Sequence, residues 1–316
     1  MSAPVREAAD ASGRARGDAS GPTLLVLGAQ GQVGFELVRE LAPLGRVVAL
    51  TRAECDLAHP TAAAEVVRRL RPTVVLNAAA YTAVDRAESD ADACHRVNAE
   101  GPGRVAEAAA GCGAALVHYS TDYIFDGTKG APYTEGDPPS PLGVYGRTKL
   151  EGEQRAAAAN PAHLVLRTSW VYATRGHNFL RTMLRLARER DELRVVADQV
   201  GAPTWARAIA AGTAQVVGAA LRAPEGADAW TRARAGVYHL TAAGATSWHG
   251  FAEAILAGDP ARGEQRARRV VPIATDEYPT PARRPACSLL DNGRLAATFG
   301  LRLPDWRAQL ALALAS

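Results

Sequence analysis

The chain has 316 residues, which is enough for one large domain or two modest ones with a sizeable buried core. Lys and Arg number 36 against 33 Asp and Glu, a net charge of +3 spread along the sequence, so nothing indicates a nucleic-acid or membrane partner. The four cysteines follow no disulfide or metal-site spacing, which favours free thiols, no bound metal and a reducing cytoplasm.

Residues 1–20 are rich in Ala, Gly, Ser and Arg, and they lack the apolar stretch that a signal peptide needs. We expect them to form a disordered leader. No apolar run elsewhere approaches the roughly 20 residues of a membrane-spanning helix.

A short apolar run over residues 23–27 indicates a buried parallel strand, and a helical pattern begins near Gln32. From the end of the strand into the start of the helix, glycines recur at every third position. This spacing gives a tight turn, lets backbone amides approach a pyrophosphate and leaves room for the helix to pack on the sheet. A glycine turn without a ligand is the alternative. The predicted contacts with a dinucleotide are Gly28, Gly31, Gln32, Val33 and Gly34.

The tip of the second predicted strand, residues 47–50, bears on which dinucleotide binds. An NAD-preferring site usually carries an acidic residue there, whereas this chain has Thr51 and Arg52. A hydroxyl and a guanidinium suit a 2′-phosphate better than a bare ribose, so we expect NADPH to be preferred, with NADH left open. The alternative is that Arg52 is a solvated loop charge. Asp56 and Leu57 follow where we expect the adenine edge.

Helical and strand patterns then alternate as a doubly wound parallel α/β sheet of the Rossmann type requires. The expected elements are helices at residues 61–70, 92–111 and 145–159 and strands at residues 73–76, 115–119 and 164–170. Because parallel strands end at one edge of the sheet, the residues after them should meet a bound dinucleotide there. The predicted contacts of this kind are Ala80, Tyr81, Thr82 and Tyr119.

Tyr145 has a lysine, Lys149, four positions on, so both side chains share one face of the predicted helix. A free phenol has a pKa of about 10, and a nearby ammonium that stabilises the phenolate would let it exchange protons near neutrality. Thr121, at the end of a different strand, would hold a substrate oxygen close to the phenol. We predict a carbonyl-reduction site from these three residues. The alternative is a surface tyrosine on a polar helix.

We expect a dinucleotide-binding domain over residues 21–175. Residues 176–316 should form mainly a second, smaller α/β substrate-binding domain, with some elements packing back on the first. Ser247 is typical of a helix N-cap before Trp248. The other predicted elements are helices at residues 178–190 and 205–221 and strands at residues 193–196 and 236–240.

The chain resembles the dTDP-4-dehydrorhamnose reductases, a family within the extended short-chain dehydrogenase/reductases. The resemblance runs from Thr23 to about Trp306. Several motifs in the right order are far more specific than a single one. The motifs lie at residues 28–34, 77–88, 120–127, 145–153, 167–172, 198–204 and 279–285.

The resemblance implies reduction of the C4 ketone of dTDP-4-dehydro-L-rhamnose to dTDP-L-rhamnose, with hydride from NADPH. Tyr145 would donate the proton and Thr121 would hydrogen-bond the same oxygen. Lys149 would lower the pKa of the phenol and bind the nicotinamide ribose. Asn98 would support a water through which the proton is replaced.

Four further residues are expected to contact the sugar nucleotide. Asp122 would accept a hydrogen bond from a sugar hydroxyl, and Trp170 would lie against the sugar or the nicotinamide. Arg283 and Arg284, in a proline-rich loop, would clamp the diphosphate. A packed strand-end aromatic and a solvated basic loop are the respective alternatives.

Rival activities of the same fold stay open. A sugar-nucleotide dehydratase is disfavoured, because its threonine would precede an acidic pair, whereas Asp122 is followed here by Tyr123. Another sugar-nucleotide 4-ketoreductase, an epimerase and a regulatory subunit similar to that of methionine adenosyltransferase are further alternatives. The expected partners are a dTDP-sugar and, by analogy with similar reductases, a second copy in a homodimer.

Overall fold

The structure, a computed structural model, describes residues 21–316, and the leader predicted for residues 1–20 lies outside them. The strands of its main sheet are β1 (Thr23–Leu27), β2 (Arg46–Leu50), β3 (Val74–Asn77), β4 (Ala115–Thr121), β5 (His163–Thr168) and β10 (Gly236–His239). They are all parallel and follow the order β10-β5-β4-β3-β1-β2. The order reverses at β1, which has β2 on one side and β3 on the other. Ligands of α/β sheets bind at such a switch point.

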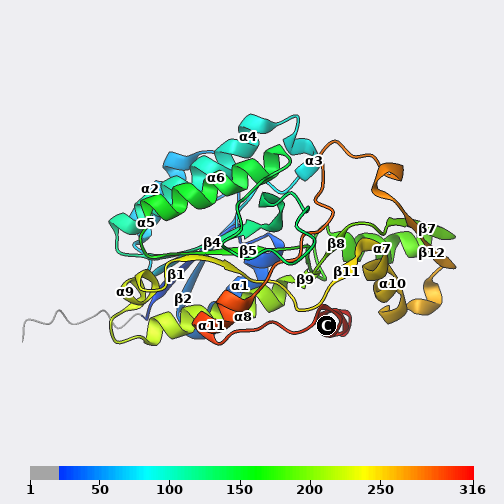
Figure 1. The fold of residues 1–316 in the computed structure, drawn as a ribbon. Helices are drawn as coiled ribbons and strands as arrows, with labels where there is room; N and C mark the ends of the chain where they lie inside the picture. Colours follow the sequence, from blue (N-terminus) through cyan, green and yellow to red (C-terminus); the bar gives the residue numbers. More distant parts are fainter. Residues whose placement is uncertain (1–20) are drawn as a thin grey trace, which may run out of the picture.

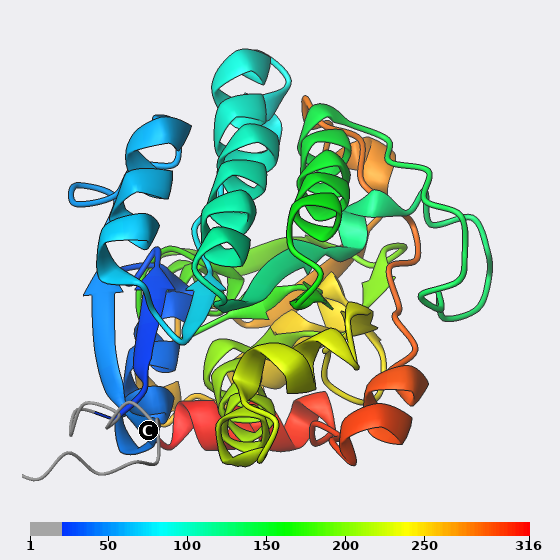
Figure 2. The same cartoon turned by 90° about the vertical axis from the view of Figure 1, so that its left-hand side faces the viewer.

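Helices cover both faces of this sheet (Figures 1 and 2). One face carries α2 (Pro60–Leu70), α5 (Gly101–Gly111) and α6 (Val144–Ala159), and the other carries α1 (Gln32–Leu41), α8 (Ala206–Arg222), α9 (Ala227–Arg232) and α11 (Gly293–Phe299). Side chains that alternate along β1 serve the two faces: Leu24 and Val26 join the core under α1 and α8, whereas Leu25 and Leu27 join the core under α2 and α5. The predicted doubly wound fold is confirmed.

Part of the chain beyond residue 175 returns to this larger lobe. β10 pairs with β5 as the outermost strand, and α8 packs along α1. Ile209, Val216 and Tyr238 share one hydrophobic core with β1. The sequence beyond residue 175 therefore contributes to both lobes.

A smaller lobe has a separate core (Figure 1, right). Its elements are α7 (Phe179–Glu189), β7 (Glu192–Val196), α10 (Trp248–Gly258), β12 (Arg269–Ile273) and α12 (Trp306–Leu314). Tyr172, Phe251 and Trp306 pack together in that core. As predicted, Ser247 caps α10, because its hydroxyl accepts a hydrogen bond from the amide of Gly250.

The rest of the described chain contains short strands and short helices. Two-residue strands pair β6 (Val171–Tyr172) with β9 (Thr204–Trp205), and β8 (Val200–Gly201) with β11 (Thr246–Ser247). The remaining short helices are η1 (Ala42–Leu44), α3 (Val84–Ala87), η3 (Asp122–Ile124), η4 (Arg262–Glu264) and η5 (Thr275–Glu277).

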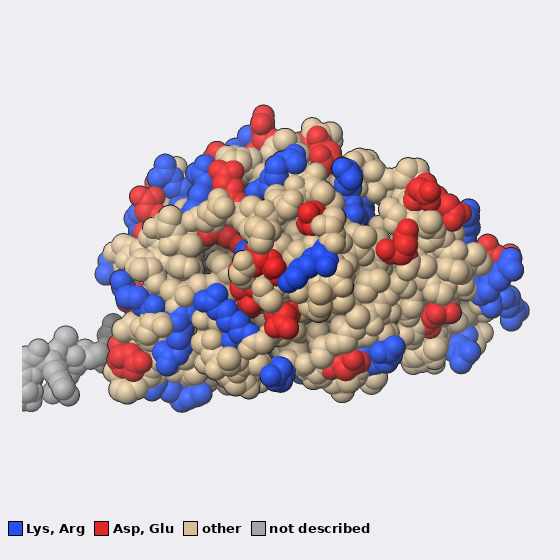
Figure 3. Space-filling view, viewed as in Figure 1, with Lys and Arg blue, Asp and Glu red and all other residues tan. Residues whose placement is uncertain are grey.

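Charges of both signs are interspersed on the face shown in Figure 3, without a large patch of one sign. Within residues 21–316, none of the helices combines the length and apolar character needed to cross a membrane. In the same part of the chain, no three His, Cys, Asp or Glu side chains are grouped so that they could hold a metal ion.

The helix predicted over residues 92–111 is interrupted. It consists of α4 (Ala91–His95), a π-helical turn η2 (Arg96–Glu100) and α5. Pro102 has no amide hydrogen and cannot bond to the carbonyl of Asn98 four residues earlier, so the α-helical ladder breaks there. That carbonyl lies against α6, since a Cβ on Gly152 would be 2.0 Å from the Asn98 oxygen. The helix predicted over residues 92–111 is confirmed in its extent, but it contains a π-helical turn that was not predicted.

We predict that Gly152→Ala destabilises the protein by about 2 kcal/mol, because the new methyl group would overlap a backbone oxygen. Urea unfolding followed by circular dichroism measures this free energy. Gly111→Ala is the matched control: it lies at the end of α5 with open space around the missing Cβ, and it should be neutral or stabilising. Equal stability of Gly152→Ala and the wild type would contradict the close packing of α6 on η2.

Candidate active site

A cavity of about 830 Å³ opens at the carboxyl ends of β1, β3, β4 and β5, where the order of the sheet reverses. Both lobes line it. The predicted site residues on its wall are Gly28, Gly31, Gln32, Val33, Arg52, Asp56, Leu57, Ala80, Tyr81, Thr82, Tyr119, Thr121, Asp122, Tyr145, Lys149, Trp170 and Arg284. Gly34, Thr51 and Arg283 do not line it.

The glycine turn forms one end of the cavity. Gly28 has a φ of 76° and approaches β3 so closely that a Cβ would lie 2.7 Å from the amide nitrogen of Ala79. Gly31 caps α1 without a side-chain hydrogen bond, so no side chain occupies the first amides of the helix. This cradle fits the pyrophosphate of a dinucleotide, which needs close backbone approach and amide donors. Gly34 serves packing, since a Cβ there would lie 2.1 Å from the Gly28 oxygen.

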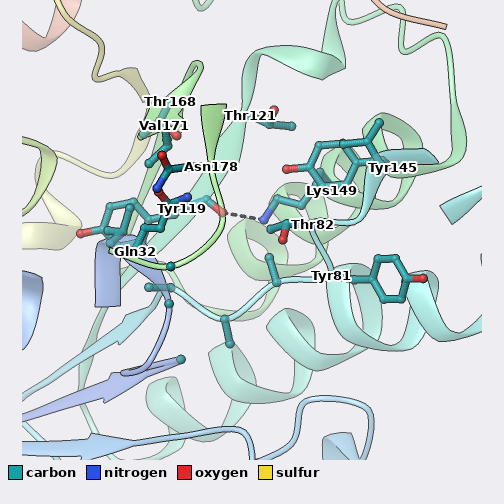
Figure 4. A pocket seen from close by; sticks show the side chains of 18 of the residues that line it. Gln32, Tyr81, Thr82, Tyr119, Thr121, Tyr145, Lys149, Thr168, Val171 and Asn178 are labelled. Carbon is teal, nitrogen blue, oxygen red and sulfur yellow. Dashed lines mark hydrogen bonds between the residues drawn. The ribbon is translucent and has the colours of Figure 1, made fainter. Parts of the chain in front are cut away.

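Tyr81 lines the cavity through its backbone. Asn98 accepts a 2.8 Å hydrogen bond from the Tyr81 amide and donates a 3.1 Å hydrogen bond to the Tyr81 carbonyl. The Tyr81 ring points away from the cavity (Figure 4), and its hydroxyl donates to Asp90 at 3.0 Å. Asn98 therefore positions this loop, which differs from the water-binding role that the resemblance implied.

Thr121, Tyr145 and Lys149 meet on one wall of the cavity (Figure 4). Thr121 ends β4, whereas Tyr145 and Lys149 lie one turn apart on α6. The Tyr145 hydroxyl points towards the space beside Thr121 and Lys149 (Figure 4). Lys149 is buried, and its ammonium donates a 2.6 Å hydrogen bond to the carbonyl oxygen of Tyr119. Residues far apart in the sequence thus form a compact group of proton donors.

Burial dominates the protonation of Tyr145. It raises the pKa of the phenol well above its usual range, although the nearby Thr121 hydroxyl opposes this rise. Burial also lowers the pKa of Lys149 to about 8, against the charge of Glu153. The negative charge of Asp122 raises the pKa of the phenol further, and the expected lowering by Lys149 stays a prediction. A phenol that stays protonated is the form that donates a proton.

Asp122 belongs to the wall of the cavity beside Thr121, but it is almost fully buried there. Its Oδ1 accepts a hydrogen bond from the Thr121 hydroxyl and its Oδ2 accepts one from Ser169, both at 3.0 Å. Burial raises the pKa of Asp122 to about 6, while neighbouring hydroxyls oppose the rise. Both carboxylate oxygens already accept from protein hydroxyls, so the geometry suits Asp122 to orienting Thr121 better than to binding a sugar hydroxyl.

The tip of β2 is more acidic than Thr51 and Arg52 alone suggest. Both the amide and the hydroxyl of Thr51 donate to Glu54 Oε2 at 2.9 Å. Arg52 lines the cavity, and its Nε donates to Asp56 at 3.1 Å. The prediction of Thr51 as a cavity residue is corrected, because its hydroxyl is taken by Glu54. Glu54 was missed although it lies only three residues away.

Arg284 and Arg283 lie on different sides of their loop. Arg284 lines the cavity, whereas Arg283 is exposed outside it. Arg284 forms a two-point salt bridge with Asp85, at 3.0 Å from Nη1 and 2.7 Å from Nη2. Of the two arginines predicted to clamp the diphosphate, only Arg284 lines the cavity, so the structure does not bring the pair together.

Trp170 connects the end of β5 to the smaller lobe. Its φ of 47° lies in the left-handed region, which a tryptophan adopts only when packing enforces it. The indole stacks on Trp248 with ring centroids 3.5 Å apart, and a Cβ on Gly201 would lie 2.4 Å from it. Trp170 is therefore both a packed aromatic and part of the cavity wall.

Comparisons with known proteins decide the family. Residues 22–316 match the family described as RmlD substrate binding domain. The chain is 54% identical to the dTDP-4-dehydrorhamnose reductase of Burkholderia thailandensis over 292 residues, which cover 92% of this chain and 97% of that relative. The chain belongs to the dTDP-4-dehydrorhamnose reductase family. The Salmonella typhimurium member is 46% identical and covers 90% of this chain, with 94% of that relative aligned.

Solved structures of dTDP-4-dehydrorhamnose reductases share the fold over nearly the whole chain. The Bacillus anthracis reductase, in complex with NADP, superimposes with a TM-score of 0.84 at 32% identity and covers 93% of this chain and 99% of that one. The Clostridium acetobutylicum protein gives a TM-score of 0.83 at 36% identity, with 93% and 98% covered.

The dTDP-4-dehydrorhamnose reductase motifs did not indicate every residue of the cavity. The loop after β6 and the start of α10 also line it, and neither was predicted. The sequence marked Asn178 as the residue at which a helix begins. Nothing in the sequence distinguished Arg175 from an ordinary loop residue or Trp248 from an ordinary core residue. The missed residues of these segments are Arg175, Gly176, His177, Asn178, Phe179 and Trp248.

Proposed function

We propose that the chain reduces the C4 ketone of dTDP-4-dehydro-L-rhamnose to dTDP-L-rhamnose with NADPH as the hydride donor. Its family and the NADP complex of a related reductase support this activity. The observation that carries the proposal is one cavity shared by the glycine turn and by the group of Thr121, Tyr145 and Lys149. A dinucleotide cradle and a proton donor in one space are what carbonyl reduction needs.

NADPH, when bound, supplies the hydride, and the chain holds it through the glycine turn and the loop after β3. Gly28, Gly31, Gln32 and Val33 would hold the pyrophosphate, since they form the cradle at the start of α1. Arg52, Asp56 and Leu57 would flank the adenosine, and Ala80, Tyr81, Thr82 and Tyr119 would line the path towards the nicotinamide.

Tyr145 would donate the proton. Reduction places negative charge on the ketone oxygen, and a half-buried, protonated phenol beside it would neutralise that charge. Thr121 would hold the same oxygen, because its hydroxyl already lies beside the phenol, and Asp122 would fix Thr121 from behind. Lys149 would bind the nicotinamide ribose with its ammonium group, which the Tyr119 carbonyl keeps in place.

The smaller lobe would act mainly as the substrate-binding part of the chain. Trp248 and Arg284 reach the cavity from the sequence beyond residue 175, and an aromatic and a guanidinium suit a sugar nucleotide. A reducing cytoplasm is the proposed place of action, supported by four unpaired cysteines. We also propose a homodimer, on the analogy of similar reductases.

Dehydration is a weaker proposal for the same cavity. A dehydratase would need a second acid after the threonine that can exchange protons with the sugar. Asp122 is buried with both oxygens accepting from protein hydroxyls, and the next residue, Tyr123, is not acidic.

We predict that Tyr145→Phe lowers kcat by at least ~100-fold, the low end for the loss of a general acid. Turnover of purified protein with NADPH and the dTDP-4-keto sugar, followed by absorbance with identification of the product, measures this. Binding of NADPH should be kept, because the ring remains. Tyr172→Phe is the matched control, since this buried hydroxyl lies outside the cavity and has no hydrogen-bond partner among the described residues.

Full turnover by Tyr145→Phe would sink the assignment of the proton donor. Wild-type protein that binds NADPH but never oxidises it with the keto sugar would favour a regulatory subunit instead. Product with the other configuration at a ring carbon, or cofactor that stays bound through turnover, would favour an epimerase.

We predict that Glu54→Gln raises the ratio of kcat/KM for NADPH to that for NADH by about two- to five-fold, a screened surface effect. The change removes a negative charge beside the place where the 2′-phosphate would lie and weakens the hydrogen bonds that Thr51 donates to residue 54. Glu65→Gln, an exposed carboxylate on α2 outside the cavity, is the matched control. An unchanged ratio in Glu54→Gln, or a clear preference of the wild type for NADH, would contradict this account of the β2 tip.

A further inference from the structure

Arg175 lies in the loop between β6 and α7, and the structure brings it against α1. Its guanidinium carbon is 3.4 Å from the centre of the Phe35 ring. Phe35 follows Gln32, the first residue of α1, by three positions, so the guanidinium lies at the first turn of that helix. Arg175 lines the same cavity as the glycine turn. A positive charge thus lies next to the dinucleotide cradle, from a segment far along the chain.

The loop that carries Arg175 is held in place by a buried asparagine. Asn178 Nδ2 donates to the carbonyls of Ala173 and Arg175, at 2.8 Å and 2.9 Å, and Oδ1 accepts from the amide of Arg181 at 3.2 Å. Asn178 and Gln32 lie on the side of the cavity away from Tyr145 (Figure 4). Asn178 therefore fixes the backbone of Arg175. This backbone lies at the end of the cavity formed by the glycine turn, away from the end that holds Tyr145.

Arg175 lacks a counter-charge. Within residues 21–316 it forms no salt bridge, and its Nη1 is buried without a hydrogen-bond partner. Arg39 lies over the same Phe35 ring, at 3.9 Å, but it pairs with Glu36 and its side chain is 62% exposed. A partly buried guanidinium without an anion is unfavourable, and a bound phosphate group would offset that cost.

We propose that Arg175 binds the pyrophosphate of the dinucleotide, opposite the amides at the start of α1. This inference rests on the proposed function, which supplies the dinucleotide. The planar guanidinium can donate to two phosphate oxygens at once, and the amino-terminal end of a helix favours the same anion. The Phe35 ring holds the guanidinium against α1.

Two other anions would enter this enzyme, and the position of Arg175 argues against both. A 2′-phosphate belongs at the tip of β2, where Arg52 lines the cavity, and the diphosphate of the sugar nucleotide belongs near Arg284. Arg175 lies over the first turn of α1 instead, where the glycine turn admits a pyrophosphate.

The test is the binding of NADP⁺ and NAD⁺ to Arg175→Met, measured by calorimetry without sugar nucleotide. Both dissociation constants should rise by the same factor, about 10- to 100-fold, as expected for a lost hydrogen bond to a charged group. Arg39→Met is the matched control and should bind both as the wild type does, because Arg39 lies outside the cavity. Arg175→Lys, which keeps the charge, should lose less affinity. It also tests the inference if the methionine variant does not fold.

Three results would overturn the inference. Weaker binding of NADP⁺ alone would place Arg175 at the 2′-phosphate. Unchanged binding of both dinucleotides with a raised KM for the sugar nucleotide would place it at the substrate diphosphate, and no change in either would make its role structural. Wild-type protein that binds neither dinucleotide would refute the proposed function itself, and this outcome is distinguishable because it does not depend on the variant.

Discussion

The placement of the Tyr145 phenol between the end of β4 and α6 is the constraint on which the site depends. In this position desolvation raises the pKa of the phenol and the negative charge of Asp122 raises it further, so the phenol remains protonated. Lys149, on α6, donates a hydrogen bond to the Tyr119 carbonyl and so connects the helix to the backbone of β4. Thr121 lines the same wall of the cavity as the phenol, and its hydroxyl donates a hydrogen bond to Asp122. The result is a proton donor whose place and protonation are set before any substrate arrives.

The walls of the cavity come from distant parts of the chain, and a few contacts hold them together. Asn98 fixes the loop after β3 because the π-helical turn aims its amide at the Tyr81 backbone. The salt bridge between Asp85 and Arg284 joins α3 to the loop of the smaller lobe. The stack of Trp170 on Trp248 joins the end of β5 to α10. These links explain how a cavity built from both lobes can keep one shape.

Local patterns in the sequence predicted much of the fold. The apolar run of β1, the glycine turn and the shared face of Tyr145 and Lys149 depend on periodicity and spacing, and the structure has all three. Contacts between segments that are distant in sequence were not predictable in this way. The π-helical turn depends on Pro102 together with the approach of Gly152, which belongs to another helix. Arg175 gains its meaning only because its loop folds back over Phe35.

The most direct test of the central claim is the ionisation of Tyr145 in the free protein. Nuclear magnetic resonance of tyrosine labelled with ¹³C at Cζ follows each phenol through a pH titration, and Tyr145→Phe assigns the signal. The account predicts that the Tyr145 signal stays that of a neutral phenol past about pH 10, the ordinary midpoint for tyrosine. A phenolate that forms near neutral pH would contradict it, and would mean that Lys149 controls the phenol after all.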